Sequence, residues 1–374
     1  MSRWAWAEVS SSAMEHNVRT MAGIVSPAQL WVVVKAEGYG HGALLAARSA
    51  KAAGAQGLCV ALVQEGVALR EAGITGPILV LSEQPPDALR AAVRLQLSSS
   101  VYSAAQLAQL EACGAVGHPV HLKIDTGMRR VGVAEADAVA LADMIAASPA
   151  VSLAGVFTHL AVADEPDNPF TDHQLDRFEA VVAALVAAGH RPTLVHAANS
   201  AGALAHPRAR YDMVRPGIGM YGLSPGPGVD DLFSALRPAM SLHARVSHVK
   251  RVAAGDRISY GLRHTFQCDT TVATLPIGYA DGVPRRLHAV GGTVLIGGKH
   301  RPIVGAVTMD QIMVDCGDGG GPMVQLGDEA VLIGTQGVHA ITAADWATAL
   351  DTIAYEIVCG ISSRIERRPV NDNL

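Results

Sequence analysis

The sequence predicts an α/β protein, a (β/α)8 TIM barrel followed by a mainly-β C-terminal domain. From residue 30 to about residue 221, short apolar runs alternate with Ala- and Leu-rich helical stretches, and there are about eight such runs. Apolar strands that alternate with helices are typical of a parallel sheet covered by helices, and eight units close a barrel. After residue 224 the pattern changes to strand-like runs separated by Gly- and Asp-rich turns, which predicts a second, β-rich domain.

The eight apolar runs are the predicted barrel strands. They are LWVVVKA (30–36), GLCVALV (57–63), PILVLSE (77–83), LSSSVYS (97–103), PVHLKIDT (119–126), VSLAGVFTHLA (151–161), TLVHAAN (193–199) and YDMVRPGIGMYG (211–222). The run at 97–103 is more polar than a typical buried strand. An open doubly wound sheet is the alternative, and the lack of a G-x-G-x-x-G motif after the first run disfavours it. The segment SPGPGVDD (224–231) is typical of a linker, and helical patterning returns only at 342–358.

Composition excludes several classes of function. The 374 residues carry a formal net charge of −5 without a dominant basic block, so we expect no nucleic-acid partner and no binding to an anionic membrane. The N-terminus has no apolar secretory segment, and no apolar stretch is long enough to span a bilayer. The five cysteines are scattered and form no C-x-x-C pair, which indicates reduced thiols. Together these features predict a cytoplasmic protein.

Polar side chains follow five of the predicted strands, at the ends where barrel enzymes carry their catalytic groups. A single polar residue at a strand end means little, because strands stop where solvent begins. Five such ends, all with cationic, imidazole or amide side chains, indicate a site. These residues are Lys35, Lys123 with Asp125, His159, Asn199 and Arg215.

Two glycine-containing turns, ANSAG (198–202) and RPGIG (215–219), follow the last two predicted strands. Barrels commonly bind a phosphate there, although either turn alone is ordinary turn chemistry. A phosphate site together with the strand-end Lys35 indicates pyridoxal phosphate held as a Schiff base. A lysine in an apolar site has a lowered pKa, which makes its neutral amine available.

The segment VVVKAEGYGHG (32–42) resembles the pyridoxal-phosphate attachment motif of bacterial alanine racemases. Further motifs in that family's order extend the likeness over essentially the whole chain. They are KIDTGMRRVG (123–132), GVFTHLAVADE (155–165), HAANSAG (196–202), VRPGIGMYG (214–222), ISYG (258–261), PIGYADG (276–282), TMDQ (308–311) and TIAYEIVCGIS (352–362). The resemblance implies a barrel at 9–228, a β-rich domain at 229–374 joined by residues 1–8, and a head-to-tail homodimer.

The resemblance also implies residue roles. Lys35 would hold the cofactor and act as one of two bases, and Tyr260 from the partner subunit would be the other. Arg215 would face the pyridine nitrogen, and because arginine stays protonated it would favour racemisation over transamination. The implied cofactor-binding residues are Lys35, Tyr39, His159, Asn199, Ser200, Arg215, Gly217, Ile218 and Tyr355.

For the substrate, the resemblance assigns the carboxylate to Arg130 and to the backbone N–H of Met309 from the partner subunit. Tyr279 and Asp310 would line the entrance. The family pattern TGM-x-R-x-G selects Arg130. Lys123 matches a lysine that is often carbamylated in this family, and a carbamate would give Arg130 a negative partner.

The expected activity is therefore interconversion of L- and D-alanine, for cell-wall peptidoglycan synthesis or for D-alanine breakdown. The alternatives are a pyridoxal-phosphate racemase of serine or basic amino acids, a fold-related decarboxylase, which Arg215 disfavours, and a non-enzymatic cofactor carrier. We expect no metal. His41, His196 and Asp281 are predicted to be structural. The chain departs from the usual Ala-Asn/Asp-Ala-Tyr after the lysine by carrying Glu37 and Gly38.

Overall fold

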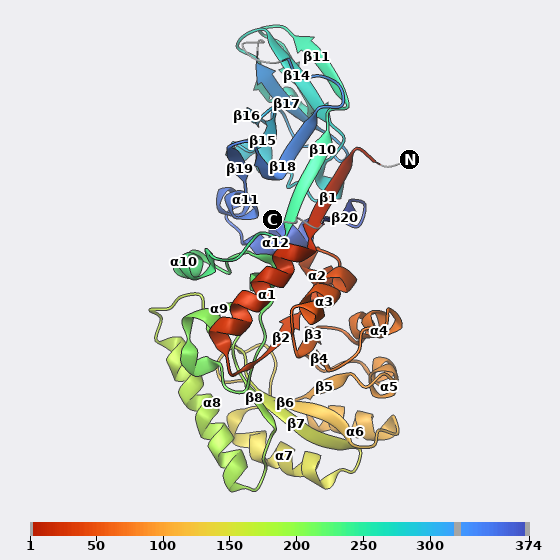
Figure 1. Ribbon diagram of the computed structural model, residues 1–374, viewed down its shortest axis with the longest axis vertical. Helices are drawn as coiled ribbons and strands as arrows, with labels where there is room; N and C mark the ends of the chain where they lie inside the picture. The colour runs from red at the N-terminus through yellow and green to blue at the C-terminus, as the bar shows by residue number, and fades with distance from the viewer. Residues whose placement is uncertain (1–2, 318–322, 371–374) are drawn as a thin grey trace. The chain divides into compact units, whose positions relative to one another are not determined.

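The computed structural model describes residues 3–317 and 323–370 and contains two compact units, which are considered separately (Figure 1). One unit is Ala13–Arg237, and the other combines Met1–Ser12 with Pro238–Leu374. The predicted domain limits, 8/9 and 228/229, differ from these by four and nine residues. The helix α10 (Asp230–Phe233) belongs to the first unit because Phe233 packs there: a Cβ on Gly219 would lie 3.1 Å from its ring. Residues 1–2 and 371–374, which the predicted second domain includes, lie outside the described residues.

The first unit contains the predicted eight-stranded parallel barrel. The sheet order is β8-β7-β6-β5-β4-β3-β2-β9, and every predicted apolar run overlaps one of its strands, with β2 and β6 each beginning one residue before the predicted run. Main-chain hydrogen bonds close the ring, from Asp212 N–H to the Val195 carbonyl (3.1 Å) and from Arg215 N–H to the Ala198 carbonyl (2.9 Å). The strands are β2 (Gln29–Val33), β3 (Gly57–Val60), β4 (Ile78–Val80), β5 (Ser98–Val101), β6 (His118–Lys123), β7 (Val151–Phe157), β8 (Leu194–His196) and β9 (Met213–Val214).

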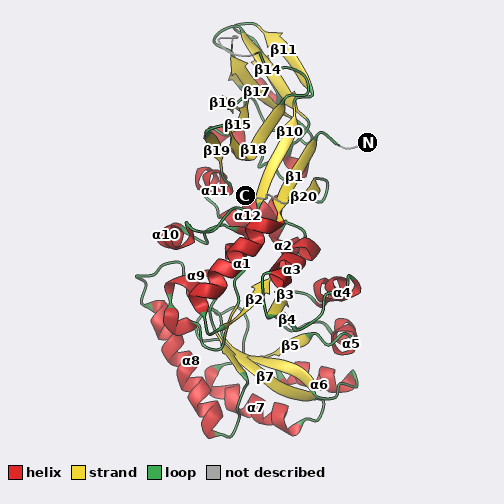
Figure 2. Cartoon of the chain, in the orientation of Figure 1, coloured by secondary structure: helices red, strands yellow, loops and turns green. Residues whose placement is uncertain are grey.

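Helices cover the outside of this barrel (Figure 2). Their starts follow ordinary capping chemistry: Ser103 Oγ accepts the N–H of Gln106, and Pro86 occupies the first turn of its helix. Besides α10, the α-helices are α1 (Ser11–Val25), α3 (Ala43–Ala52), α4 (Val63–Glu71), α5 (Pro86–Arg94), α6 (Ala104–Ala112), α7 (Ala138–Ala147), α8 (Phe170–Ala187) and α9 (Ser200–Ala205). The short element labelled α2 (Lys35–Tyr39) has left-handed backbone angles inside it and is a turn. Single 3-10 turns are η1 (Glu135–Asp137), η2 (Pro207–Ala209), η3 (Ile218–Tyr221) and η4 (Pro227–Val229).

The polar strand β5 is buried, and two of its three serines have hydrogen-bond partners. Ser100 Oγ donates to the carbonyl of Val80 (2.6 Å), and Ser99 Oγ lies 2.9 Å from His118 Nε2. A buried hydroxyl with a hydrogen-bond partner avoids the desolvation penalty that an unpaired one would carry. The unusual composition of this strand is therefore a packing feature.

The second unit is mainly β, as predicted. Its largest sheet has the order β16-β15-β18-β10-β1-β20, with β19 paired to β18, and the N-terminal strand β1 lies between β10 and β20 (Figure 1). Smaller sheets are β11-β14-β17 and β12-β13. The strands are β1 (Ala5–Ser10), β10 (Met240–Arg245), β11 (His248–Val252), β12 (Arg257–Ile258), β13 (His264–Thr265), β14 (Thr270–Leu275), β15 (Thr293–Ile296), β16 (Lys299–Pro302), β17 (Ile312–Gly317), β18 (Glu329–Gln336), β19 (His339–Ile341) and β20 (Glu366–Val370).

The helical pattern at 342–358 forms two helices, α11 (Ala343–Leu350) and α12 (Ala354–Gly360). Asp351 separates them in a left-handed conformation, with φ of 57°. Short 3-10 turns in this unit are η5 (Tyr260–Leu262), η6 (Tyr279–Asp281) and η7 (Leu287–Val290). Among the residues that the structure describes, no helix is both long and apolar enough to cross a membrane.

Candidate active site

Lys35 follows β2 at the carboxyl end of the barrel and begins a left-handed turn. Ala36, Glu37, Gly38 and Tyr39 all have φ between 51° and 60°. Non-glycine residues disfavour this conformation by roughly 1–2 kcal/mol each, so the turn is strained and needs external support. Gly38 suits it, because a Cβ there would also lie 3.1 Å from the Cβ of Ala46. This backbone gives the Glu37-Gly38 departure a partial explanation, since Gly38 relieves strain while the Glu37 side chain is exposed.

Glu65 in α4 holds this turn in place. Its Oε1 accepts the N–H of Ala36 (2.7 Å), while its Oε2 accepts the N–H groups of Ala61 (2.8 Å) and Leu62 (3.0 Å). One carboxylate therefore satisfies backbone donors from two segments at once, with charge-assisted hydrogen bonds. His41 supports the far end, with Nδ1 2.9 Å from the carbonyl of Tyr39. The structural role predicted for His41 fits this contact, whereas the role of Glu65 had no signal in the sequence beyond its place near a helix start.

Tyr39 reaches the turn after β9. A Cβ on Gly217 would lie 2.4 Å from the Tyr39 hydroxyl, so only glycine permits this approach. Ser200 Oγ accepts the N–H groups of Gly217 (2.9 Å) and Gly219 (3.2 Å), and Ile218 between them is fully buried. The two glycine turns predicted from the sequence therefore meet, with Tyr39 beside them.

Asn199, which the sequence analysis placed among the cofactor-binding residues, caps α9. Its Oδ1 accepts the N–H of Gly202 at 2.9 Å. This contact fixes the start of the segment that carries Ser200.

Arg215 is buried at the end of β9 and begins a chain of hydrogen bonds through the barrel. Its Nη1 lies 2.5 Å from Nδ1 of His196, and its Nη2 donates to the carbonyls of Thr158 (2.8 Å) and Ala197 (3.0 Å). A guanidinium only donates, so Nδ1 of His196 accepts and its Nε2 carries the proton. That Nε2 lies 2.9 Å from Nδ1 of His121, which must therefore accept in turn. The donor-only guanidinium of Arg215 thus sets the tautomer of both histidines.

Both histidines are neutral at physiological pH. Burial, aided by the charge of Arg215, lowers the pKa of His121 to about 3 and that of His196 well below its usual value. His196 also stacks on the ring of Phe157, with 4.8 Å between ring centroids. The sequence predicted that His196 packs or hydrogen-bonds in the barrel, and the structure shows both contacts. His121 was not singled out from the sequence, because only the folded barrel brings its strand β6 beside the strand β8 that carries His196.

The mouth of the barrel gathers positive charge. Burial lowers the pKa of Lys123 to about 8, and the charges of Arg215, Arg130 and Lys35 add to this effect. Asp125 opposes it. Arg215 has its pKa lowered to about 10 by burial, which still leaves it protonated at neutral pH. Such a region favours an anionic ligand.

His159 lies among these cations. Loss of water around its ring, together with the charges of Arg215 and Arg130, keeps its pKa well below the usual value. At neutral pH His159 is therefore an uncharged hydrogen-bonding group. Two of these cations also act on Cys59 in β3. Burial raises the pKa of the Cys59 thiol to about 12, and the charges of Arg215 and Lys35 oppose that rise.

The loop after β6 distinguishes the two arginines of the MRR sequence. Arg129 is turned back on the loop: its N–H donates to Asp125 Oδ1 at 3.0 Å, and its Nη1 lies 3.9 Å from Asp125 Oδ2. Arg130 is exposed and acts electrostatically on Lys123 and His159. This arrangement makes Arg130 the arginine of the pair that is near the other predicted site residues.

The remaining predicted site residues belong to the second unit. Tyr260 is 75% exposed at the tip of the β12-β13 hairpin, and Tyr279 and Met309 are 42% and 52% exposed. Asp310 is exposed, and Tyr355 is half-buried in α12. Their roles toward the barrel residues stay predictions. No group of three or more His, Cys, Asp or Glu side chains within 3–317 and 323–370 is placed to hold a metal ion.

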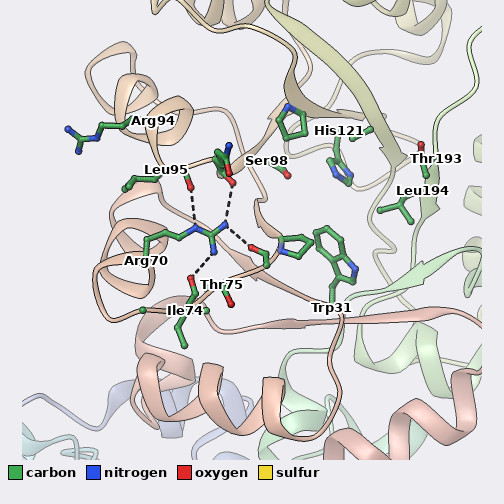
Figure 3. A pocket seen from close by; sticks show the side chains of 16 residues that line it. Trp31, Arg70, Ile74, Thr75, Arg94, Leu95, Ser98, His121, Thr193 and Leu194 are labelled. Carbon is green, nitrogen blue, oxygen red and sulfur yellow. Dashed lines mark hydrogen bonds between the residues drawn. The ribbon is translucent and has the colours of Figure 1, made fainter.

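A pocket of about 800 Å³ lies at the other end of the barrel strands (Figure 3). Ser98, Pro119 and Leu194, which lie at or next to the starts of their strands, contribute to its wall. Arg70 donates there to main-chain carbonyls of 74, 76, 95 and 96, at 2.7 to 3.3 Å. His121 lines it, so the hydrogen-bond chain from Arg215 ends beside this pocket, far along the strands from Lys35.

Comparison with known proteins decides the family. Residues 9–225 match the family described as "Alanine racemase, N-terminal domain", and residues 239–369 match "Alanine racemase, C-terminal domain". The chain belongs to the alanine racemase family. Among its relatives, the alanine racemase of Symbiobacterium thermophilum is 49% identical over 98% of this chain and 97% of the relative. That of Nostoc sp. is 42% identical over 98% and 96%.

Solved structures of alanine racemases share the fold over the full length. The enzyme from Bacillus anthracis, solved with bound L-Ala-P, is 37% identical, with a TM-score of 0.94 over 100% of this chain and 97% of that one. The enzyme from Streptomyces lavendulae is 38% identical, with a TM-score of 0.91 over 99% and 98%.

Proposed function

We propose that this protein is an alanine racemase that interconverts L- and D-alanine with pyridoxal phosphate by a two-base mechanism. Membership of the alanine racemase family supports this proposal. Within the site, the supporting observation is the buried Arg215 at the barrel mouth. Because Arg215 stays protonated, it can donate a hydrogen bond to a ring nitrogen without giving up its proton. A partner of this kind would limit electron withdrawal by the cofactor ring and would favour simple return of the Cα proton.

The residues present fit pyridoxal phosphate. The close approach of the Tyr39 hydroxyl to Gly217 forms a compact cradle of hydroxyl and N–H groups, to which Ser200 belongs. The cations at the barrel mouth would favour an anionic cofactor. Lys35 would hold the cofactor covalently, and the remaining contacts would come from Tyr39, His159, Asn199, Ser200, Arg215, Gly217, Ile218 and Tyr355. When bound, the cofactor makes the Cα proton of an attached amino acid acidic.

Racemisation requires removal of a proton from one face of Cα and delivery of a proton to the other. Lys35 would exchange the proton on one face through Nζ, and the Tyr260 hydroxyl of the partner subunit would do so on the opposite face. A tyrosine has an ordinary pKa near 10, so its phenolate needs stabilisation. His159 would provide it as a neutral hydrogen-bond donor, with the positive charge of Arg215 behind it.

The substrate carboxylate would be held by Arg130 and by the N–H of Met309 from the partner subunit. The engagement of Arg129 with Asp125 supports Arg130 as the free arginine of the pair for this task. Tyr279 and Asp310 would line the entrance. Bulky aromatic and charged side chains there favour a small substrate side chain.

Lys123 would carry a carbamate. Its pKa of about 8 leaves part of the lysine as a neutral amine at pH 7 to 8. The Nζ lone pair would form a bond to the carbon of CO2, and the nitrogen would release a proton, leaving a carbamate anion beside Arg130. Mass spectrometry of the intact native protein tests this: an added mass of one CO2 is expected, and it should be missing from Lys123→Ala.

A homodimer would complete each site. Exposure of Tyr260, Tyr279 and Met309 on the second unit supports their use by another copy of the chain. Mixing Lys35→Ala with Tyr260→Ala after partial unfolding tests it. Mixed dimers would contain one site with both bases, so racemase activity should rise well above the low residual activity of either variant alone. No recovery in the mixture, despite dimers in sedimentation, would contradict a shared site.

The direct test of the activity is racemisation by the purified, cofactor-loaded protein on a panel of L-amino acids, followed by circular dichroism. Alanine should react fastest. Faster turnover of serine or lysine would contradict the assignment to alanine. The panel is needed because the volume of a pocket discriminates against one extra methylene group by only about 1–3 kcal/mol.

A further inference from the structure

Asp281 was predicted to be a turn residue, and the structure shows that it is also a fully buried charge in η6. Its Oδ1 and Oδ2 lie 2.5 and 2.6 Å from Nη1 and Nη2 of Arg3. Its Oδ2 also accepts the N–H of Gly278 at 2.9 Å. The bidentate pair compensates the buried carboxylate, which would be costly without a partner.

Arg364 is a second arginine on the same carboxylate. Its Nε lies 3.3 Å from Asp281 Oδ1, and its Nη2 donates to Asp310 Oδ1 at 2.7 Å. The N–H of Ser362 donates to the Asp281 carbonyl at 3.1 Å, which brings the segment of Arg364 onto the turn. Arg364 therefore connects a buried anchor with the residue next to Met309.

The main chain of the same turn lies directly against the Met309 segment. The N–H groups of Tyr279 and Ala280 donate to the carbonyls of Thr308 (2.9 Å) and Met309 (3.1 Å). A Cβ on Gly278 would lie 2.3 Å from the Thr308 carbonyl oxygen, so a larger residue cannot occupy that position without movement. The Met309 peptide is thus held by hydrogen bonds on one side and by the Asp310–Arg364 pair on the other.

Side-chain burial holds this arrangement only in part, because Tyr279 and Met309 are each about half exposed. We propose that Arg364, anchored on buried Asp281, is a positioning residue that orients the Met309–Asp310 segment for binding of the substrate carboxylate; this rests on the proposed function. Arg3 compensates Asp281 as well, but it bonds to Asp281 and the Pro276 carbonyl and so provides a matched control.

The test compares Arg364→Lys with Arg3→Lys in the cofactor-loaded protein. A lysine cannot bridge two carboxylates with the forked geometry of arginine. Arg364→Lys should raise the KM for alanine about fivefold with kcat within about twofold, because an exposed charge pair such as Arg364–Asp310 contributes only modestly to holding the segment. Arg3→Lys should lower Tm and leave KM unchanged. Equal KM changes in both variants, or a loss in kcat alone, would overturn the proposal.

A double-mutant cycle tests whether Arg364 acts through Asp310, and hydrogen exchange tests the same contact without substrate. Asp310→Ala should raise KM as Arg364→Lys does, and the double variant should add nothing further. Amide exchange at Tyr279 and Ala280 should accelerate in Arg364→Lys and stay unchanged in Arg3→Lys. Faster exchange without any racemisation by the parent protein would count against the proposed function alone, whereas unchanged exchange would count against the role of Arg364.

Discussion

The two turns that carry the proposed bases are built alike and supported differently. Lys35 precedes the left-handed residues 36–39, and Tyr260 lies in a turn where Ser259, Gly261 and Leu262 have φ of 66°, 77° and 48°. Lys35 is half-buried and follows a barrel strand in the chain. Tyr260 is 75% exposed at the tip of a hairpin whose two strands have two residues each.

The difference lies in what holds each backbone. The first turn is fixed by the Glu65 carboxylate and by packing against the barrel. The second depends on weaker neutral contacts, such as Ser259 Oγ donating to the Ala306 carbonyl at 2.8 Å. Strained backbone persists where its surroundings over-determine it. The barrel base is thus preorganised within one chain, while the hairpin base is presented outward, as a group serving a partner subunit would be.

Replacing the barrel base should have the largest effect. Lys35→Ala should lose covalent cofactor attachment and lower kcat/KM by about 10⁴-fold, since both a nucleophile and a proton-transfer group are removed. Borohydride reduction followed by mass spectrometry checks the attachment. Lys299→Ala, an exposed control, should retain the cofactor mass. Retention of the cofactor mass in Lys35→Ala would contradict this role.

Replacing the hairpin base should have a smaller and directional effect. Tyr260→Phe should lower kcat/KM for racemisation by about 10²- to 10³-fold, equally in both directions because the equilibrium constant between the enantiomers is one, and should leave cofactor attachment unchanged. Exchange of the Cα proton with solvent should fall most when L-alanine is the substrate. Deuterium incorporation from D2O, measured separately from each enantiomer, checks this. Equal losses from both enantiomers would contradict a scheme with one base on each face.

Acid should destabilise the barrel through its buried histidines. The pKa values of His121, His159 and His196 are lowered on folding, so the unfolded chain binds protons that the folded chain does not. Their stabilising contribution is complete above the unfolded pKa near 6.5 and falls by about 1.4 kcal/mol per pH unit and group as pH drops toward their folded values. Tm between pH 7 and pH 5 should fall less steeply in His121→Asn than in His173→Gln, an exposed control.

Weakening the support of the first turn should affect stability moderately. Glu65→Gln removes the charge from three hydrogen bonds to backbone N–H groups and should lower the free energy of unfolding by about 2 kcal/mol. Glu71→Gln at the exposed end of the same helix should change it by less than about 0.5 kcal/mol. Urea unfolding measures both variants, and equal effects would contradict the special role of Glu65.

The smallest expected effect tests the backbone strain of the first turn, without removing any functional side chain. Gly38→Ala should lower the free energy of unfolding by about 1 kcal/mol, from its φ of 60° and its contact with Ala46. Gly23→Ala in α1 meets no neighbouring atom and should raise it by about 0.5 kcal/mol. Opposite signs in thermal unfolding would confirm that the left-handed turn is the cause.

The barrel strands and their order could be predicted from the sequence because burial on both faces imposes apolar runs, and parallel strands need helices between them. The site residues at strand ends followed from the same logic, as for Lys35 and Arg215. Glu65 and His121 could not be found in this way. Their partners are 29 and 75 residues away in the chain, and no local pattern marks such distances.

The sequence by itself determined the fold class, the family and the lysine at the end of the first barrel strand, because periodicity and motif spacing are local properties. Only the tertiary structure decided which groups share a proton, a charge or a carboxylate. The chain from Arg215 through His196 to His121, and the pairing of Arg3 and Arg364 on Asp281, arise from distances of a few ångströms between remote segments. Hydrogen bonds and buried charges depend on those distances, and folding alone sets them.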